Sequence, residues 1–298
     1  MRNMTSVAGV IALLALLFGA GLALADEPVE KSGSASAEGT VYIENMVGTI
    51  KVIGWDKNEV HLEGTLGKDV EDLKFDAGKK KTYIEVKYPR HARNISHGAD
   101  LVIRIPKGSS LEVECVSADI LVSDVEGEVE LSSISGDVDF SGMCEELQAG
   151  SISGRVLVDG GARMMELETV SGDIKAMGKV AAIDGESVSG SIHLEFDTFL
   201  DLSLESVSGT LKATGGLDPK GSFNFDAVSG DVILTVPGDV DAEFEVSTFS
   251  GGIDNGFGQK SRKTSRYAPG RELEFTTGDG RAQVEINSFS GDVIIKKN

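Results

Sequence analysis

A short motif recurs along the chain and constrains its fold more than any other feature. It consists of an aliphatic or aromatic residue, here called the opener, followed by Ser-Gly and most often by Asp. The position after the serine is evenly spaced at Ala118 (in a degenerate first copy), Gly136, Gly154, Gly172 and Gly190, and more widely spaced afterwards at Gly209, Gly230, Gly251 and Gly291. The openers are Val116, Ile134, Ile152, Val170, Val188, Val207, Val228, Phe249 and Phe289, and the same frame fits earlier around Met46. Regular repetition of this kind indicates a stack of similar units.

The residues before each opener alternate between apolar and polar. Apolar residues mostly stand five and three positions before it, as at Leu111 and Val113, and a Ser or Thr mostly stands directly before it. Such alternation predicts β-strands, and Ser-Gly predicts a tight turn or a positive φ between two of them. One such short unit cannot bury its apolar stripe alone, whereas stacked units bury theirs against each other.

The predicted fold is all-β, a parallel β-helix or solenoid of about ten short rungs with repeats of 18–21 residues. Stacked rungs place equivalent residues above one another, which favours this fold over the alternative, an antiparallel meander or sandwich. The predicted organisation is a signal peptide over 1–25, a flexible N-terminal segment over 26–37 and a single β-solenoid domain over 38–298. Within that domain we expect irregular early rungs over 38–110, regular repeats over 111–253, a basic insertion over 254–283 and the last rung over 284–298.

The first 25 residues have the features of an export signal. Arg2 precedes an almost wholly apolar run from Val7 to Leu24, and Ala-Leu-Ala then offers a cleavage site before Asp26. An uncleaved membrane anchor is the alternative, because the apolar run approaches the length that spans a bilayer. We expect an exported protein in the periplasm, in the medium or at the cell surface, with no stable membrane insertion after cleavage.

The charge balance argues against two classes of partner. The chain has 28 Lys and Arg against 48 Asp and Glu, a formal net charge of −20. Nucleic acid binding needs clustered basic residues, and an anionic membrane surface repels such a chain, so neither is an expected partner.

Several further segments carry a resemblance to a known family. They are Gly48-Thr49-Ile50-Lys51-Val52 with Gly54-Trp55-Asp56, the stretch Leu101 to Gly108, the Ser-Gly-Asp series and Gly278-Asp279-Gly280. Over residues 38–298 the chain resembles the putative-adhesin β-strand-repeat family of exported bacterial proteins. The resemblance implies a right-handed, all-β helical fold and an adhesive or surface role in the cell envelope.

Three groups of residues are candidate sites. Asp119, Asp137 and Asp173 follow the Ser-Gly turns; stacked carboxylates suit calcium, although capping of the turns is the favoured interpretation. His91 and His97 share one loop, either as metal ligands or as solvated residues. The third group lies in the basic insertion and could bind an anionic glycan, an acidic partner or another copy, or be a solvated excursion: Lys260, Arg262, Lys263, Arg266 and Tyr267.

Catalytic motifs are lacking: the sequence has no nucleophile elbow, zinc-protease helix or phosphate loop. We therefore expect no cofactor, and a non-catalytic, adhesin-like binding or scaffold protein of the cell envelope. Its expected partner is an envelope protein or glycan, and self-association is open. The alternative is a polysaccharide lyase or hydrolase on the same scaffold. Cys115 and Cys144 are expected as two buried thiols, with a disulfide as the alternative.

Overall fold

A computed structural model describes residues 26–90, 95–265 and 269–298 of the chain, and the expected signal peptide over 1–25 lies outside them. These described residues form strands and loops and contain no helix. Accordingly, nothing in the described ranges is a helix long and apolar enough to cross a membrane. The prediction of an all-β fold is confirmed.

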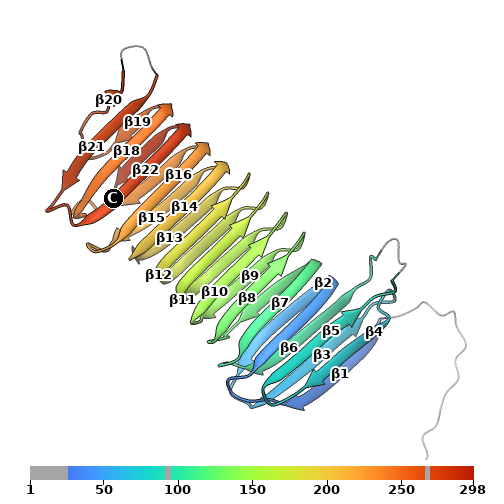
Figure 1. The fold of residues 1–298 in the computed structure, drawn as a ribbon. Helices are drawn as coiled ribbons and strands as arrows, with labels where there is room; N and C mark the ends of the chain where they lie inside the picture. Colours follow the sequence, from blue (N-terminus) through green and yellow to red (C-terminus); the bar gives the residue numbers. More distant parts are fainter. Residues whose placement is uncertain (1–25, 91–94, 266–268) are drawn as a thin grey trace, which may run out of the picture.

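The strands stack along one axis (Figure 1). Their pairings define two faces, with the Ser-Gly corners between them. The first face is a parallel run in the spatial order β5 (Lys81–Lys87), β2 (Thr40–Trp55), β7 (Ser110–Ser123), β8 (Glu128–Ser133), β10 (Glu146–Ser151), β11 (Val156–Thr169), β12 (Ile174–Ser187), β14 (Asp201–Ser208), β16 (Ser222–Ser229), β22 (Ala282–Ser290) and β18 (Ala242–Ser250). The second face runs in the order β6 (Ala99–Pro106), β2, β7, β9 (Val138–Met143), β11, β12, β13 (Ile192–Phe199), β15 (Leu211–Leu217), β17 (Val232–Val236), β23 (Val293–Lys297) and β19 (Ile253–Asn255). The long strands β2, β7, β11 and β12 bend from one face to the other and belong to both.

The pairing register follows the sequence repeat. Leu111 pairs with Val129, Val129 with Leu147 and Leu147 with Met165, so each residue pairs with its equivalent in the next copy of the motif. Equivalent residues therefore lie directly above one another, and the predicted solenoid-like repeat is confirmed.

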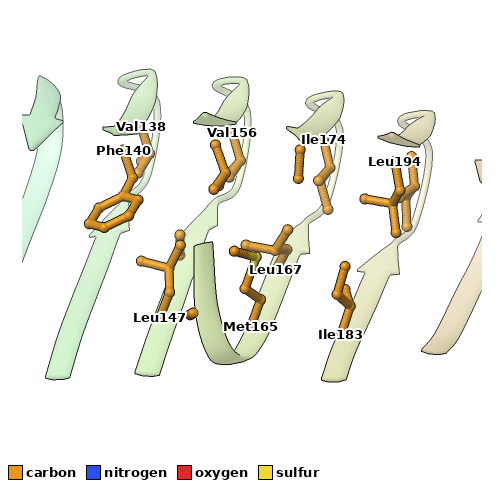
Figure 2. Close-up of a cluster of buried hydrophobic side chains, with 14 of the residues drawn as sticks. Val138, Phe140, Leu147, Val156, Met165, Leu167, Ile174, Ile183 and Leu194 are labelled. Atoms are coloured by element: carbon orange, nitrogen blue, oxygen red, sulfur yellow. The ribbon is translucent and has the colours of Figure 1, made fainter. Parts of the chain in front are cut away.

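The core lies between the two faces and consists of the inward side of the alternation. Figure 2 shows two rows of side chains that point toward each other. One row comes from the second face, Val138, Phe140, Val156, Ile174 and Leu194, and the other from the first face, Leu147, Met165, Leu167 and Ile183. All are nearly inaccessible to water, so the stack is held together chiefly by apolar burial.

A buried hydroxyl stands directly before most openers, and several of these hydroxyls bond to the backbone of the corners. Ser151 Oγ donates to the carbonyl of Gly136 in the preceding rung and accepts from the amide of Gly154 in its own corner, both at 2.9 Å. Ser133 and Ser187 accept the amide of their own corner glycines in the same way. The Ser or Thr of the motif thus satisfies buried backbone groups where the strand ladder is interrupted.

The corner glycines are required by the close approach of neighbouring rungs. A Cβ placed on Gly172 would lie 1.8 Å from the carbonyl oxygen of Gly154, and one on Gly190 would lie 1.7 Å from that of Gly172. Among the Ser-Gly corners only Gly230 has a positive φ. Backbone spacing, more than the turn conformation, therefore explains the glycine at most corners.

The order of the rungs departs from chain order at both ends. Strand β2 lies between β7 and the later strands β5 and β6, and β22 with β23 lies between β16–β17 and β18–β19. Residues 284–298, expected as the last rung, are therefore last in the sequence but interior in the stack. Only pairing between distant segments determines this order, which the repeat pattern does not encode.

Antiparallel strands close both ends of the parallel stack. They are β1 (Glu27–Ser34), β3 (Glu59–Leu66) and β4 (Asp72–Ala77) at one end, and β20 (Arg262–Lys263) and β21 (Arg271–Thr277) at the other. The segment expected to be flexible over 26–37 instead contains β1, which pairs along its whole length with β3. The outermost strands carry charged side chains, which discourage edge-to-edge association.

A substitution at one corner tests the close approach. Gly172→Ala should lower the free energy of unfolding by about 1–3 kcal/mol or more, because a backbone carbonyl occupies the space of the added methyl. Gly150→Ala is the matched control, since its Cβ would lie 3.4 Å from the nearest atom. Denaturant unfolding of both variants measures the difference, and equal stabilities would contradict the steric explanation.

One carboxylate positions the interior rung that ends the chain. Asp241 Oδ1, between β17 and β18, accepts the amides of Asp279 at 2.8 Å and Arg281 at 3.2 Å, and its Oδ2 accepts from the Arg281 guanidinium. These residues lead directly into β22. The Arg281 side chain, followed by the two backbone donors, lowers the pKa of Asp241 below its ordinary value.

Removal of this carboxylate should loosen the interior rung. The pKa of Asp241 is lower in the folded state than its unfolded-state value of 3.8. Its contribution to the free energy of unfolding is therefore fully present above pH 3.8 and is lost as the pH falls through the folded-state pKa. Asp241→Ala should speed amide exchange in β22 and β23 at neutral pH, and the difference from wild type should disappear in strong acid. Exposed Asp239 gives the control, Asp239→Ala; equal exchange in both variants would refute the role of Asp241.

Candidate functional site

The openers form an exposed apolar ladder along the whole stack. In spatial order they are Met46, Val116, Ile134, Ile152, Val170, Val188, Val207, Val228, Phe289 and Phe249, each 37–58% exposed. At the usual strand spacing of 4.7–4.9 Å, ten such residues extend over about 43 Å. Contiguous apolar surface of this length is uncommon on a protein surface and marks a binding site.

The ladder lines a long groove with a volume of about 930 Å³. Nine rungs contribute to it, from Cys115 on β7 to Ser247 and Phe249 on β18. Its lining residues are openers, the Ser and Thr residues that directly precede them, and carboxylates two positions before the openers. Ser206, at 5% exposure, is one of these lining residues, and its side-chain oxygen has no hydrogen-bond partner among the described residues.

Aromatic residues lie at both ends of the groove. At one end the rings of Phe249 and Phe289 stack at 4.9 Å with an interplanar angle of 7°. At the other, a depression of about 680 Å³ shares Cys115, Ser132 and Ile134 with the groove and extends it to Met46 and Tyr88. The Tyr88 hydroxyl donates to Asn45 Oδ1 at 2.7 Å, which fixes the ring at this end.

Carboxylates line the groove without a compensating cation. Glu168, Glu186, Glu205 and Asp226 occupy the same position in four successive rungs. None of them forms an ion pair with a described residue. No Lys, Arg or His is among the described residues that line the groove itself, whereas the depression that extends it contains Lys87 and Arg90.

The remainder of the first face is acidic as well, except at its β5 end, which carries Lys81 and Lys87. Its outward positions before the openers hold Glu44, Glu112, Glu114, Glu128, Glu130, Glu146, Glu166, Glu168, Asp184, Glu186, Asp201, Glu205, Asp226, Glu243, Glu245 and Glu285, and the same strand segments contain no Lys, Arg or His. Burial raises the pKa of Glu168, with the neighbouring carboxylates Glu166 and Glu186 adding to it. Burial likewise raises the pKa of Glu112, followed by the effect of Glu130.

Charges on the second face are mixed. Arg155 Nη2 lies 3.1 Å from Asp137 and 3.9 Å from Asp139, and the row Lys175, His193 and Lys212 crosses three rungs. The two lysines, after burial, lower the pKa of His193. Negative charge is thus concentrated on the face that borders the groove.

The predicted calcium candidates interact with the backbone. Asp119 Oδ1 accepts the amide of Asp137 at 3.0 Å, Asp137 Oδ1 accepts that of Arg155 at 2.8 Å, and Asp173 Oδ1 accepts that of Ser191 at 2.8 Å. Each carboxylate therefore caps the corner of the next rung. No group of three or more metal-ligating side chains occurs in the described part of the chain.

Of the two loop histidines, His97 is the one that the structure describes. His97 Nδ1 lies 3.6 Å from Asp69 Oδ2 and its amide donates to the same carboxylate, whereas His91 lies outside the described residues.

The three described residues of the basic insertion, Lys260, Arg262 and Lys263, do not line the groove. Arg262 contacts Glu274 at 3.0 Å and Glu272 at 3.6 Å, so its charge is partly compensated. Lys260 and Lys263 are exposed near it. Arg266 and Tyr267 lie outside the described residues.

The two cysteines are unpaired thiols. Burial raises the pKa of both Cys115 and Cys144 to about 12, which keeps them protonated. Cys115 lines the groove, and Cys144 lies elsewhere.

The exposed ladder is the feature that the sequence analysis did not identify as a site. The signal was present in the phase of the alternation. Residues five, three and one positions before an opener point inward, so the opener itself falls on the outward phase. An outward apolar residue in every copy is the pattern that would have predicted a binding surface.

Fold and site together define a β-solenoid-like repeat protein with a continuous apolar groove along one acidic face. The family model of Toastrack DUF4097 matches residues 41–296, and the chain belongs to this family.

The solved structures that are similar to this chain are distant in sequence. A putative lipid binding protein from Parabacteroides distasonis ATCC 8503 is 11% identical, with a TM-score of 0.50 over 90% of this chain and 96% of that one. A putative adhesin from Bacteroides fragilis NCTC 9343 is also 11% identical, with a TM-score of 0.42 over 90% and 97% of the two chains. No curated protein matches the chain. At these identities the likeness concerns the fold alone.

The stacked carboxylates generate a prediction about pH. A raised folded-state pKa means that ionised Glu168 disfavours the folded state, and that stability is regained as the pH falls through this pKa toward the unfolded value of 4.5. Glu168→Gln should therefore raise the free energy of unfolding at pH 7 by less than about 1 kcal/mol, because the side chain is exposed.

Unfolding of this variant at pH 7 and pH 4.5 measures the effect. The gain should shrink at the lower pH, where wild-type Glu168 takes up its proton. Glu195→Gln removes a carboxylate from the mixed second face and serves as the control, with no gain expected. If the stability gained by Glu168→Gln were larger at pH 4.5 than at pH 7, the explanation would be contradicted.

Proposed function

We propose that the chain is an exported, non-catalytic binding protein of the cell envelope, and that its groove holds an elongated partner in an adhesin-like or scaffolding role. The observation that carries the proposal is the exposed opener ladder, which runs through every copy of the motif. Its side chains pack against no other part of the described chain closely enough to bury them. Membership of the Toastrack family, and the putative adhesins among proteins of similar fold, support the same class of function.

The architecture suits an elongated partner. The groove crosses nine rungs and is open along its length, whereas a small substrate needs a closed site with a few converging polar groups. The proposal takes the stack as a right-handed helix of about ten rungs within one domain over 38–298, as the family resemblance implies. It also takes residues 1–25 as a cleaved signal, which places the groove in the periplasm, in the medium or at the cell surface.

A ladder variant tests this function. Ile152→Ser, Val170→Ser and Val188→Ser together remove three adjacent apolar contacts without adding charge, and should leave the fold intact because the side chains are exposed. Binding of the purified, fluorescently labelled chain to cell-envelope fractions should fall about tenfold or more, since each lost apolar contact contributes roughly 0.5–1 kcal/mol.

Met143→Ser is the matched control, because Met143 is 56% exposed and lies away from the groove. The same preparation, incubated with acidic and neutral polysaccharides, should release no products. Binding that is unchanged in the ladder variant, or turnover of a polysaccharide, would overturn the proposal. Mass spectrometry of the N-terminus, with protease treatment of intact cells, tests cleavage before Asp26 and the location of the protein.

A further inference from the structure

The chemistry of the groove restricts what can occupy it. An occupant that covers the ladder must be apolar along one edge and about 43 Å long if it reaches every opener. A polypeptide in an extended conformation needs about thirteen residues for this length, at about 3.3 Å per residue.

The other edge of the occupant faces carboxylates. Glu168, Glu186, Glu205 and Asp226 line four consecutive rungs, where strand spacing places them about 5 Å apart. Like charges stacked at this spacing repel one another, and a cation from outside relieves the repulsion. No basic residue among the described residues of the groove supplies that cation, so a cationic occupant gains an attraction that the chain itself leaves unused.

The sign of the charge disfavours elongated amphiphiles that are themselves anionic. An anionic phospholipid or an acidic glycan would place its negative groups against sixteen carboxylates on this face. Lys and Arg suit the site, because their apolar stems lie along an apolar surface while their charged ends reach past it.

We propose that the groove binds a polypeptide segment that carries Lys or Arg along one edge and apolar side chains along the other. This inference rests on the proposed function, that the groove holds an elongated partner, and adds the chemical class of that partner. Negative charge along this face also increases the rate of encounter with such a segment at low ionic strength.

The test uses three 12-residue peptides with alternating sequences, Leu-Lys, Leu-Ser and Leu-Glu, and the full chain as the cell produces it. The Leu-Lys peptide should bind at least about tenfold more tightly than the other two, and more weakly as the salt concentration rises. The quadruple variant Glu168→Gln, Glu186→Gln, Glu205→Gln and Asp226→Asn should weaken its binding about tenfold or more.

The matched control changes the net charge by the same amount on the second face. Asp159→Asn, Glu195→Gln, Asp197→Asn and Asp254→Asn remove four exposed carboxylates that form no ion pair with a described residue. This variant should bind the Leu-Lys peptide as wild type does. Thermal unfolding of both quadruple variants verifies that each remains folded.

The outcomes separate this inference from the proposed function. If the Leu-Ser and Leu-Lys peptides bind equally well and neither binds the Ser ladder variant, the inference of a cationic partner would be overturned. The proposal that the groove binds an elongated partner would still stand. Binding of Leu-Lys that both quadruple variants weaken equally, or that the ladder variant leaves unchanged, would show unspecific attraction and overturn the inference. Absence of Leu-Lys binding, or ladder-dependent binding of phosphatidylglycerol vesicles in its place, would overturn it as well.

Discussion

The close parallel stacking of the backbone at the Ser-Gly corners is the constraint on which the rest of the structure depends. There the carbonyl oxygen of one corner occupies the space that a Cβ of the next glycine would need, as between Gly154 and Gly172. The buried hydroxyl of the preceding Ser, such as Ser151, then bridges the backbone of two successive rungs. This contact sets the register of each rung on its neighbour, so that every other position of the motif is stacked above its equivalent.

Because the rungs stack in register, a residue type that recurs at one position of the motif forms a continuous row of side chains along the molecule. An inward apolar residue becomes a continuous core, and an outward one becomes the exposed ladder from Met46 to Phe249. Carboxylates form rows too, and like charges in adjacent strands destabilise the sheet. On the second face Arg155 between Asp137 and Asp173 reduces this cost, whereas the row from Glu168 to Asp226 has no such compensation. Repulsion between stacked carboxylates is thus reduced on one face and left uncompensated on the other. A role in binding explains this difference better than a role in folding.

The sequence predicts the fold class well because the determinants are local. Alternation, the even spacing of the motif and Ser-Gly are sufficient to predict stacked parallel strands, and the pairing of Leu111 with Val129 follows the repeat. The order at the ends is not predictable in this way, because β22 satisfies the same pattern equally well beside β16 or beyond β18. Likewise, the polar segment Glu27–Ser34 becomes a strand only because β3 offers an unpaired edge. The groove could be predicted only in part. Its apolar openers follow from the phase of the alternation, whereas its charge distribution can be predicted only when it is known which rows of residues border it.

The interior position of the C-terminal rung links folding to completion of the groove. Phe289 comes from β22 and Phe249 from β18, two strands far apart in the sequence, and their stacked rings form the aromatic end of the groove. Without β22, Val228 on β16 and Phe249 would have no rung between them, and the ladder would be interrupted at that end. Beyond β18 the antiparallel strands β21 and β20 carry charge, which disfavours further stacking on the first face. The last segment of the chain therefore completes the ladder and joins the terminal cap to the rest of the stack.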